Sequence, residues 1–571
     1  MCGIHAVLSP SPRDRSLPPS LSHALRARGP DHFGQVVRQS PGGGWALCLT
    51  STVLALRGDH VARQPLVASG SGSGSGSGSD GGSVLCWNGE AWRVGGRTVE
   101  AGENDGEVVM GRLLQHAAVA SDGDGDDGLL VEGVVEVLRG VEGPFAFVYY
   151  DAGREVLVFG RDRLGRRSLM VNDGEDQGLE ICSVAGDGEG WKEVEADGVY
   201  VVRLRGETKW LVERHEWVQG GENAADFVSG ISRFNRALPR SGGQGPLTAA
   251  SPSVTMLREQ LLESLRLRIL NIPPPPSSSG KTRVAVLFSG GLDCTVLARL
   301  AHEVLDADQG IDLLNVAFEN PRVVAQLRKE SNGNLPDFYE ACPDRITGRR
   351  SFAELHMVCP RRAFQFVAVN VPYAETQAHR QQIISLMRPH NTEMDLSIAY
   401  ALYFAARGQG VCTESSCSNS SPAPYTSPAR VLLSGLGADE LFGGYSRHPS
   451  AFRQKGYAGL VDELLLDVGR LGKRNLGRDD RVMAHWGKEV RFPYLDERLV
   501  RWAIETPAWE KCDFENNEGV SGVEAGKRVL RLLALELGME SVAREKKRAI
   551  QFGSRTAKME SGRVKGTTLI S

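Results

Sequence analysis

The stretch V-A-V-L-F-S-G-G-L-D-C, from Val284 to Cys294, decides the fold of the carboxyl-terminal half of the chain. Its apolar start ends abruptly at Ser289-Gly290-Gly291, and an apolar-periodic run begins at Leu292. A short apolar run, a glycine turn and a helical pattern predict a strand, a loop and a helix. The backbone N–H groups of such a loop and the positive end of the helix form an anion site. We therefore predict that this loop binds phosphate, because glycine admits phosphate oxygens where a Cβ would collide.

The loop lacks the lysine of a Walker-A sequence, so transfer of a γ-phosphate is the weaker interpretation. Its pattern S-G-G-x-D-S/C resembles the pyrophosphate loop of the ATP pyrophosphatases. That resemblance implies cleavage of ATP between its α- and β-phosphates, so that a substrate carboxylate takes AMP and pyrophosphate stays in the loop with magnesium. An ordinary strand–helix turn with two convenient glycines is the alternative when the loop is taken alone.

The bulk composition is that of a globular protein, with 571 residues of which 41% are hydrophobic and 24% charged. This length predicts two or three domains. The net charge of −4 gives no electrostatic case for binding nucleic acid or an anionic membrane. No apolar run reaches a transmembrane length and the start does not have a signal-peptide pattern, so we expect a cytoplasmic protein. The ten cysteines form no C-x-x-C pair, which argues against a zinc ribbon or a redox motif.

The pattern of apolar residues changes along the chain, from one typical of β-strands to one in which strands and helices alternate. Residues 2–215 contain short apolar runs separated by Gly and Asp, which is typical of β-rich structure. Within them, a Gly/Ser repeat at 69–79 and an Asp/Gly-rich stretch at 121–128 predict surface insertions. Residues 216–252 have the composition of a linker. Across residues 253–571 strand patterns alternate with helical ones, which predicts a parallel α/β sheet.

Cys2 is the first candidate for chemistry. It is followed by Gly3 and Ile4, and the initiator Met is normally removed before a small residue, so we expect Cys2 to become the first residue. Its α-amino group, with a reference pKa of about 7.7–8.0, is then a base that can deprotonate the thiol directly or through a water. An unremarkable terminal cysteine is the alternative for this residue alone.

Four motifs follow Cys2 in order: L-R-A-R-G-P-D at 25–31, W-N-G-E at 87–90, D-G-E at 105–107 and R-D-R-L-G-R-R at 161–167. Each alone has a plain interpretation, such as a hairpin turn for N-G-E and a surface turn for R-G-P-D. Together with Cys2 they resemble the class II, amino-terminal-nucleophile glutamine amidotransferases over essentially all of residues 2–215. The resemblance implies an αββα sandwich in which the cysteine attacks the glutamine amide and ammonia leaves.

The same resemblance implies further roles. An Asn-Gly pair supplies donors for the oxyanion that tetrahedral chemistry requires, and a downstream carboxylate holds the α-amino group of glutamine. These roles fall on Asn88 with Gly89 and on Asp105. The family also places an Arg on the strand before the sequence that begins at Gln64, where it binds the glutamine carboxylate. Here the Arg comes late, at Arg57, and since a bidentate clamp depends on Arg geometry, the strength of glutamine binding is left open.

A second small-residue turn, S-G-L-G-A-D-E-L-F-G-G-Y at 434–445, follows an apolar run at 431–433. A strand, a turn and paired carboxylates suit a loop that faces an adenylate and carries a magnesium ligand. Mg²⁺ is typically held by one or two carboxylates plus substrate phosphates. We therefore predict that Asp293 and Asp439 form a magnesium-binding pair.

Two later motifs, E-V-R-F-P-Y-L-D at 489–496 and R-E-K-K-R-A-I-Q-F-G-S at 544–554, complete an ordered set. The set resembles the asparagine synthetase domain across 253–556, and most closely the asparagine synthetase domain-containing protein group. The resemblance implies a basic side chain near the phosphates at Lys547, or at Lys546 if the register shifts by one. It implies contacts with ATP and pyrophosphate at Leu287, Ser289, Gly290, Gly291, Asp293, Cys294, Val316 or its neighbours, Ser434 and Gly435. Taken singly, Asp293 is also a candidate helix N-cap and Lys547 a candidate solvated charge.

One departure from this family concerns the acceptor. Glutamine-dependent asparagine synthetases have Glu at the third position of S-G-x-G-x-D-E, whereas this chain has Leu436. Leucine can neither accept a proton nor orient ammonia, so that general-base role is vacant. We expect acceptor chemistry that differs from aspartate amidation, or turnover that is weak or lost.

The sequence thus predicts a two-domain protein of α+β and α/β class. A glutaminase domain (2–215) and a linker (216–252) precede an ATP pyrophosphatase domain (253–571). By resemblance its substrates are glutamine, ATP with Mg²⁺, and a carboxylate, aspartate first, which gives asparagine biosynthesis. The alternatives are a non-catalytic scaffold or nucleotide-binding protein of the same fold, and a ligase with another acceptor, such as a β-lactam-forming enzyme. We expect no nucleic-acid or membrane partner, and oligomeric state is left open, a homo-oligomer included.

Overall fold

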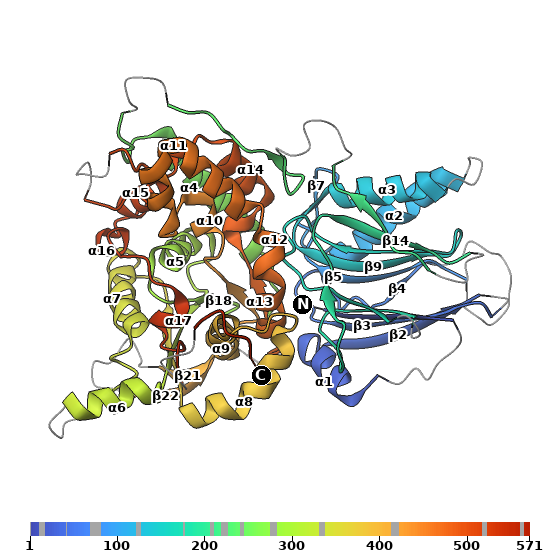
Figure 1. The fold of residues 1–571 in the computed structure, drawn as a ribbon, viewed down its shortest axis with the longest axis horizontal. Helices are drawn as coiled ribbons and strands as arrows, with labels where there is room; N and C mark the ends of the chain where they lie inside the picture. Colours follow the sequence, from blue (N-terminus) through green and yellow to red (C-terminus); the bar gives the residue numbers. More distant parts are fainter. Residues whose placement is uncertain are drawn as a thin grey trace. The chain divides into compact units, whose positions relative to one another are not determined.

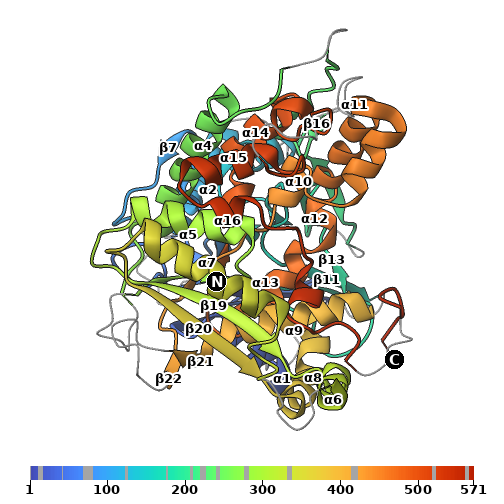
Figure 2. The same ribbon diagram turned by 90° about the vertical axis from the view of Figure 1, so that its left-hand side faces the viewer.

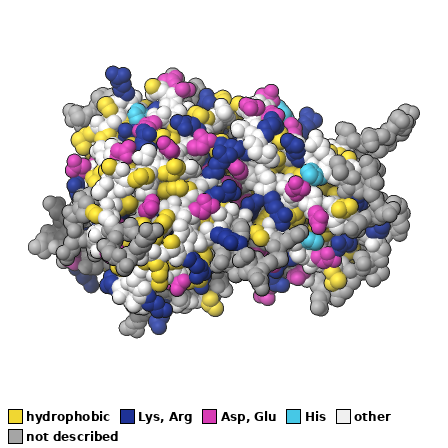
Figure 3. Space-filling model, turned by 90° about the horizontal axis from the view of Figure 1, so that it is seen from above, with side chains coloured by type: hydrophobic (Ala, Val, Ile, Leu, Met, Phe, Trp, Pro, Cys, Tyr) yellow, Lys and Arg dark blue, Asp and Glu magenta, His cyan; other side chains and the backbone are white. Residues whose placement is uncertain are grey.

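The computed structural model describes residues 2–10, 17–40, 43–68, 81–121, 127–174, 178–205, 210–218, 227–239, 245–274, 282–330, 337–412, 422–516, 522–559 and 565–570. The predicted insertion at 69–79 lies outside these residues, as does most of that at 121–128. No helix among the described residues is long and apolar enough to cross a membrane. Basic and acidic side chains are interspersed on the face in Figure 3.

The chain divides into two compact units. Unit 1 consists of Met1–Ala225 and Leu471–Gly487, and unit 2 of Asp226–Arg470 and Lys488–Ser571. This division differs from the boundaries expected from the sequence, which place 471–487 in the carboxyl-terminal domain. The physical reason is a set of buried ion pairs that hold 471–487 in unit 1, such as that between Arg28 and Asp480.

Unit 1 contains two six-stranded antiparallel sheets (Figure 1). The first has the order β13 (Lys192–Glu193), β11 (Met170–Gly174), β12 (Gly178–Cys182), β1 (Gly3–Ser9), β3 (Ala46–Val53) and β2 (His32–Gln39). The second has the order β15 (Glu213–Glu216), β14 (Gly198–Arg203), β10 (Val156–Arg161), β9 (Phe145–Asp151), β5 (Val84–Gly89) and β4 (Leu66–Val67). A small sheet joins β7 (Arg97–Thr98), β6 (Arg93–Val94) and β8 (Val141–Glu142).

Apolar residues of both large sheets form one core between them, with Ile4 and Leu47 from the first sheet and Val148 and Leu157 from the second. The other face of the second sheet packs against α2 (Asp105–Ser121) and α3 (Asp127–Arg139) through a separate apolar cluster. Helix α1 (Pro19–Arg28) contacts β1 and β3 of the first sheet. Two short helices, α12 (Leu471–Arg474) and α13 (Leu476–Ala484), complete unit 1. The predicted αββα sandwich is confirmed.

Unit 2 is built on a seven-stranded sheet. The parallel strands are β20 (Phe364–Val371), β19 (Ile311–Phe318), β18 (Val284–Leu287), β23 (Val431–Leu433) and β24 (Glu489–Arg491). Antiparallel strands β21 (Gln409–Cys412) and β22 (Ala423–Thr426) extend the β20 edge. A separate hairpin, β16 (Phe227–Val228) with β17 (Ser232–Arg233), lies within the stretch that the sequence assigns to the linker. The predicted parallel α/β sheet is confirmed.

Helices cover this sheet (Figure 2). α5 (Leu292–Val304) and α7 (Pro343–Val358) pack against each other, and α9 (Glu393–Arg407) packs against β19, β20 and α8 (Tyr373–Met387). The remaining helices are α4 (Pro252–Ile269), α6 (Pro321–Glu330), α10 (Ala438–Phe442), α11 (Arg447–Val468), η2 (Pro493–Leu495), α14 (Glu497–Glu505), η3 (Ala508–Glu510), α15 (Arg528–Glu536), α16 (Glu540–Ala543) and α17 (Ile550–Gly553). The carboxyl ends of β18 and β23 lead directly to α5 and α10, which positions both small-residue turns at one edge of the sheet.

Candidate functional site

The thiol centre of unit 1 lies at the start of β1. Cys2 is buried, and its backbone nitrogen lies 3.0 Å from Asn88 Oδ1 on β5, to which it donates a hydrogen bond. That nitrogen would be the α-amine if Met1 were removed. Gln64 Nε2 lies 3.8 Å from Cys2 Sγ, and Gln64 Oε1 accepts a hydrogen bond from the Trp87 backbone at 2.8 Å. The predicted nucleophile and Asn88 are therefore brought together.

Asn88 also presents a hydrogen-bond donor. Its side chain is fully buried, and among the described residues its Nδ2 atom has no hydrogen-bond partner. Since Oδ1 accepts from Cys2, the amide group is held with Nδ2 available. A Cβ on the neighbouring Gly89 would lie 2.7 Å from Phe145 Cβ and 2.9 Å from Pro144 O, so only glycine fits. A preorganised donor beside a nucleophile is what an oxyanion requires.

Asp105, at the start of α2, forms hydrogen bonds to residues on both sides of this turn. Its Oδ2 atom accepts hydrogen bonds from Trp87 Nε1 at 2.9 Å and from the Ala91 backbone at 2.8 Å. These hydrogen bonds fix the residues before and after the segment that carries Asn88 and Gly89. The structure therefore places Asp105 beside the predicted oxyanion donors and gives it a supporting role there.

Arg57 lies near the same turn. Its Nε atom is 3.8 Å from Glu90 Oε2, and its Cζ atom is 5.3 Å from the centre of the Trp92 ring. Glu90 directly follows Gly89 in sequence. The candidate carboxylate clamp is thus next to the oxyanion turn and faces an acidic side chain.

The pyrophosphate-type loop of unit 2 joins β18 to α5 as predicted. Gly290 has a φ of +80°, and a Cβ there would lie 2.5 Å from Gly348 Cα on α7. Both facts require glycine. Ser351 Oγ on α7 donates to Gly290 O at 2.7 Å, and Cys294 Sγ donates to Gly291 O at 3.3 Å. These two hydrogen bonds fix the backbone of the loop at Gly290 and Gly291.

A pocket of about 170 Å³ opens onto this loop. Its walls include most residues predicted to contact the nucleotide: Leu287, Ser289, Gly291, Asp293, Cys294, Val316, Ser434 and Gly435. Gly290 shapes the loop but is not among the lining residues. Leu402 and Ala405 of α9 add an apolar wall, and Asp344 and Arg548 add charges. The structure therefore gathers the predicted set around one cavity with an apolar wall and a polar loop.

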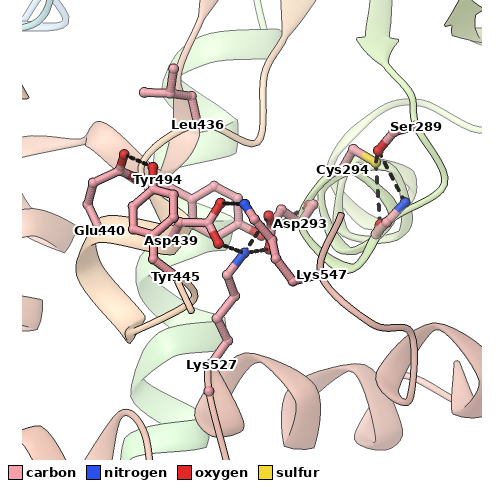
Figure 4. Close-up of polar contacts among 12 residues, drawn as sticks. Ser289, Asp293, Cys294, Leu436, Asp439, Glu440, Tyr445, Tyr494, Lys527 and Lys547 are labelled. Carbon is pink, nitrogen blue, oxygen red and sulfur yellow. Dashed lines mark hydrogen bonds and ion pairs between the residues drawn. The ribbon is translucent and has the colours of Figure 1, made fainter. Parts of the chain in front are cut away.

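Asp293, which lines this pocket, and Asp439, which does not, face a common point (Figure 4). Lys527 Nζ lies 2.8 and 2.7 Å from the two carboxylate oxygens of Asp293 and 2.6 Å from Asp439 Oδ1. Lys547 Nζ binds the other oxygen of Asp439. Burial lowers the pKa of Lys527, but the two carboxylates outweigh it and raise that pKa above its ordinary value. Burial works against ionised Asp439, yet Lys527 and Lys547 lower its pKa.

This convergence fits a divalent cation. The ammonium of Lys527 shows that both carboxylates accept one positive charge between them. Among the described residues, no group of three or more His, Cys, Asp and Glu side chains is arranged to hold a metal ion. Asp293 and Asp439 would therefore bind Mg²⁺ only together with phosphate oxygens and water, which is the usual arrangement for this ion.

A family model described as asparagine synthase matches residues 423–462 and 453–567. "Asparagine synthetase domain-containing protein 1" of Bos taurus is 32% identical over 99% of this chain and 97% of its own length. This chain belongs to the asparagine synthetase domain-containing protein family. The resemblance drawn from the sequence motifs is confirmed.

Two more distant likenesses accompany this family. "Putative asparagine synthetase [glutamine-hydrolyzing] 1" of Methanocaldococcus jannaschii is 37% identical over 23% of this chain and 28% of its own length. Among solved structures, a glutamine phosphoribosylpyrophosphate amidotransferase from B. subtilis matches with a TM-score of 0.27 and 13% identity, over 65% of this chain and 81% of that one.

Sequence reasoning missed Lys527 in this family member. The residue is buried, has a φ of +55° and directly precedes α15, where its ammonium reaches both aspartates. The sequence shows only a lysine after Gly526, with no spacing that connects it to Asp293 or Asp439. Lys547, which was predicted, does reach Asp439, and Lys546 has no described contact with either aspartate.

Leu436 stands apart from the lysine–aspartate contacts (Figure 4). Glu440, which follows Asp439 on this turn, is buried, and its Oε1 atom accepts a hydrogen bond from Tyr445 Oη at 2.5 Å. Burial raises the pKa of Glu440, and the charge of Asp439 raises it further. Position 436 itself carries a leucine, which has no titratable group.

Proposed function

We propose that this protein is a glutamine-dependent, ATP-consuming amidotransferase. One observation carries the proposal: a single chain holds a buried Cys2–Asn88 centre and a phosphate-type loop whose two carboxylates converge on one cation. Membership of the asparagine synthetase domain-containing family supports an amidotransferase-like ligase. In this proposal ammonia is released at Cys2 and used at the loop. We place the protein in the cytoplasm.

The glutaminase half-reaction follows from unit 1. The α-amine of Cys2 removes the thiol proton, and Sγ attacks the amide carbon of glutamine. The negative charge on the amide oxygen is stabilised by Asn88 Nδ2 and the Gly89 N–H. The amine returns the proton to the leaving nitrogen as ammonia departs, and water then hydrolyses the thioester to glutamate. The hydrogen bond from Cys2 N to Asn88 Oδ1 holds the amine that acts as the base and the Asn88 side chain that acts as the oxyanion donor in a fixed arrangement.

The ligase half-reaction follows from unit 2. A carboxylate oxygen of the acceptor attacks the α-phosphorus of ATP, and pyrophosphate leaves into the loop between Gly290 and Asp293. Bound Mg²⁺ would neutralise charge on the phosphates. Lys527 and Lys547, already gathered at the loop, supply positive charge to the leaving group. Ammonia then attacks the acyl carbon and AMP departs. Aspartate is the first candidate acceptor, and asparagine the corresponding product.

The decisive experiment is ATP–pyrophosphate exchange with a panel of carboxylic acids, aspartate first. The proposal expects exchange that depends on one acid, and AMP formation that rises when glutamine is added. Glutamate release should be lost in Cys2→Ala, while acid-dependent exchange persists. Absence of exchange with every acid, in a protein that releases no glutamate from glutamine, would contradict the proposal.

A second candidate function is nucleotide binding without turnover. Leu436 favours it, because no base occupies that position, and so does Arg57, whose partner in the structure is Glu90. This candidate expects ATP binding at the loop with neither pyrophosphate exchange nor glutamate release. Isothermal titration with a non-hydrolysable ATP analogue, beside the exchange assay, separates the two functions.

A further inference from the structure

Two motifs of unit 1 have no part in the chemistry above: L-R-A-R-G-P-D at 25–31 and R-D-R-L-G-R-R at 161–167. Both meet on α13. Arg28 Nη2 donates to Asp480 Oδ2 at 2.8 Å, and Arg167 Nη1 lies 3.6 Å from Asp480 Oδ1. Asp480 is fully buried and Arg28 nearly so. The motifs therefore bind a carboxylate that the sequence places far away, in the carboxyl-terminal half.

Arg28 also touches the nucleophile. Its Nε atom donates to the Cys2 carbonyl oxygen at 3.4 Å, on the opposite side of the residue from the Asn88 contact to the Cys2 nitrogen. A guanidinium is planar, so fixing Nη2 on Asp480 also fixes the direction of Nε. Asp480 is thus joined to Cys2 through one planar guanidinium group.

Asp480 is itself held firmly. Its Oδ2 atom accepts a hydrogen bond from the Ser168 backbone at 3.2 Å. The next residue, Arg481, donates to Ser168 Oγ at 2.8 Å and to Glu193 Oε1 at 2.9 Å. Because buried charges are costly to leave unpaired, such a network tolerates little movement.

We infer that Asp480 is a positioning residue of the glutaminase centre, which holds Arg28 and through it the Cys2 backbone. The inference rests on the proposed glutaminase function. Cys2 needs its amine, its thiol and the Asn88 donor in one geometry, and a displacement near 1 Å of such a group costs about 10²-fold in rate. Asp480 would raise the rate of thiol attack without contacting glutamine.

The test uses the full chain and a diazoketone analogue of glutamine. The Cys2 sulfur forms a thioether with the methylene carbon of the reagent, which takes up a proton, and dinitrogen leaves. Mass spectrometry follows the labelling of Cys2. We expect Asp480→Asn to lower the maximal labelling rate between about 10- and 100-fold, with little change in the half-saturating concentration of the reagent.

The chain offers a matched control. Asp479 is also buried on α13, and it pairs with Arg478 at 2.8 Å. Asp479→Asn should label Cys2 at the wild-type rate. If Asp480→Asn does not fold, the double variant Arg28→Met with Asp480→Asn removes both members of the ion pair and is measured instead, with the same loss expected.

The outcomes separate the two proposals. Labelling of the Asp480 variants at the wild-type rate overturns the inference alone, as does an equal loss in Asp479→Asn, which would indicate a general structural effect. A wild-type protein that is not labelled at Cys2 overturns the glutaminase proposal and this inference with it. Loss confined to the Asp480 variants supports both.

Discussion

Asp293 and Asp439 bind the same ammonium group, that of Lys527, with Nζ–oxygen distances of 2.7 and 2.6 Å. The two aspartates reach this point from the helices that follow β18 and β23. Two carboxylates at one position repel each other unless a cation lies between them. Lys527 therefore neutralises the two aspartates, which would require another cation if Lys527 turned to a bound phosphate.

Removing that ammonium should make stability depend on Mg²⁺. We expect Lys527→Met to destabilise the protein by roughly 3 kcal/mol, the lower bound for breaking a buried pair, because Lys547 still neutralises part of the charge. Added Mg²⁺ should restore more of the melting temperature in the variant than in the wild type. Lys511→Met is the control, since the buried Lys511 ammonium donates to the Ala503 carbonyl and not to a carboxylate. Equal Mg²⁺ responses in both variants would contradict this prediction.

Gly290 and Gly291 of the loop should differ in how well they tolerate substitution by alanine. Gly290→Ala places a Cβ at φ +80° and 2.5 Å from Gly348 Cα, so we expect it to destabilise unit 2 by at least about 1–3 kcal/mol and to abolish nucleotide binding. Gly291→Ala is the matched control, because its φ is −69° and the nearest atom to its Cβ is Ser289 Oγ at 3.4 Å. Denaturant unfolding measures both. A Gly291→Ala protein as unstable as Gly290→Ala would show that the geometry is not the cause.

Asn88→Ala should lower the glutaminase kcat by about 10²–10³-fold, as loss of one oxyanion donor does. The Km for glutamine should change much less, because Nδ2 acts on the charged intermediate. Glutamate release is the measurement. Asn172→Ala, which removes an amide that donates to Glu189 O on the surface, is the control. A change in Km without a change in kcat would assign Asn88 to substrate binding instead.

Leu436→Glu should restore a proton acceptor beside the loop. If the missing base limits amidation, AMP formation in the presence of aspartate, ATP and ammonia should rise in the variant. Leu436→Gln has a similar size and no carboxylate, so it should stay at the wild-type rate. An unchanged rate in Leu436→Glu would refute the idea that the missing Glu matters.

Asp344, which lines the pocket beside the Ser289 loop, should give stability a specific pH dependence. Burial raises its pKa to about 7, while Arg548 opposes that rise. The folded protein then holds a proton that the unfolded chain has lost between pH 3.8 and 7, so this residue's contribution falls as pH rises through that window. Relative to the wild type, Asp344→Asn should gain stability from pH 4 to pH 7. If the difference in unfolding free energy between the two proteins stays constant from pH 4 to pH 7, the prediction is wrong.

The sequence predicts this protein well wherever function is carried by local motifs. The β18–Ser289–α5 loop follows from residue types and order, because turns and helix starts have local chemical signatures. The Cys2–Asn88 centre follows from the resemblance to the class II glutamine amidotransferases. The αββα layering is implied by the resemblance rather than by periodicity, and the sequence yields no prediction of the strand order.

The contacts that the sequence did not reveal are long-range. Lys527 has no local pattern that directs it to Asp293, and the pairing of Arg28 with Asp480 joins residues 452 positions apart. An isolated charged residue in a sequence predicts a solvent-exposed side chain. Only the three-dimensional structure shows that these particular residues are buried. The boundary expected after residue 252 likewise missed the return of 471–487 to unit 1.

That return of 471–487 restricts how the protein can be divided. A fragment that ends before α12 would retain Arg28 and Arg167 without Asp480, and so would keep guanidinium groups buried without their counter-ion. A fragment that begins after the linker would carry α13 without the surface that it covers in unit 1. The two proposed activities are therefore not modular in this chain. A single cut should not yield either half as an independently folded protein, and separating the two halves would require moving α13 together with unit 1.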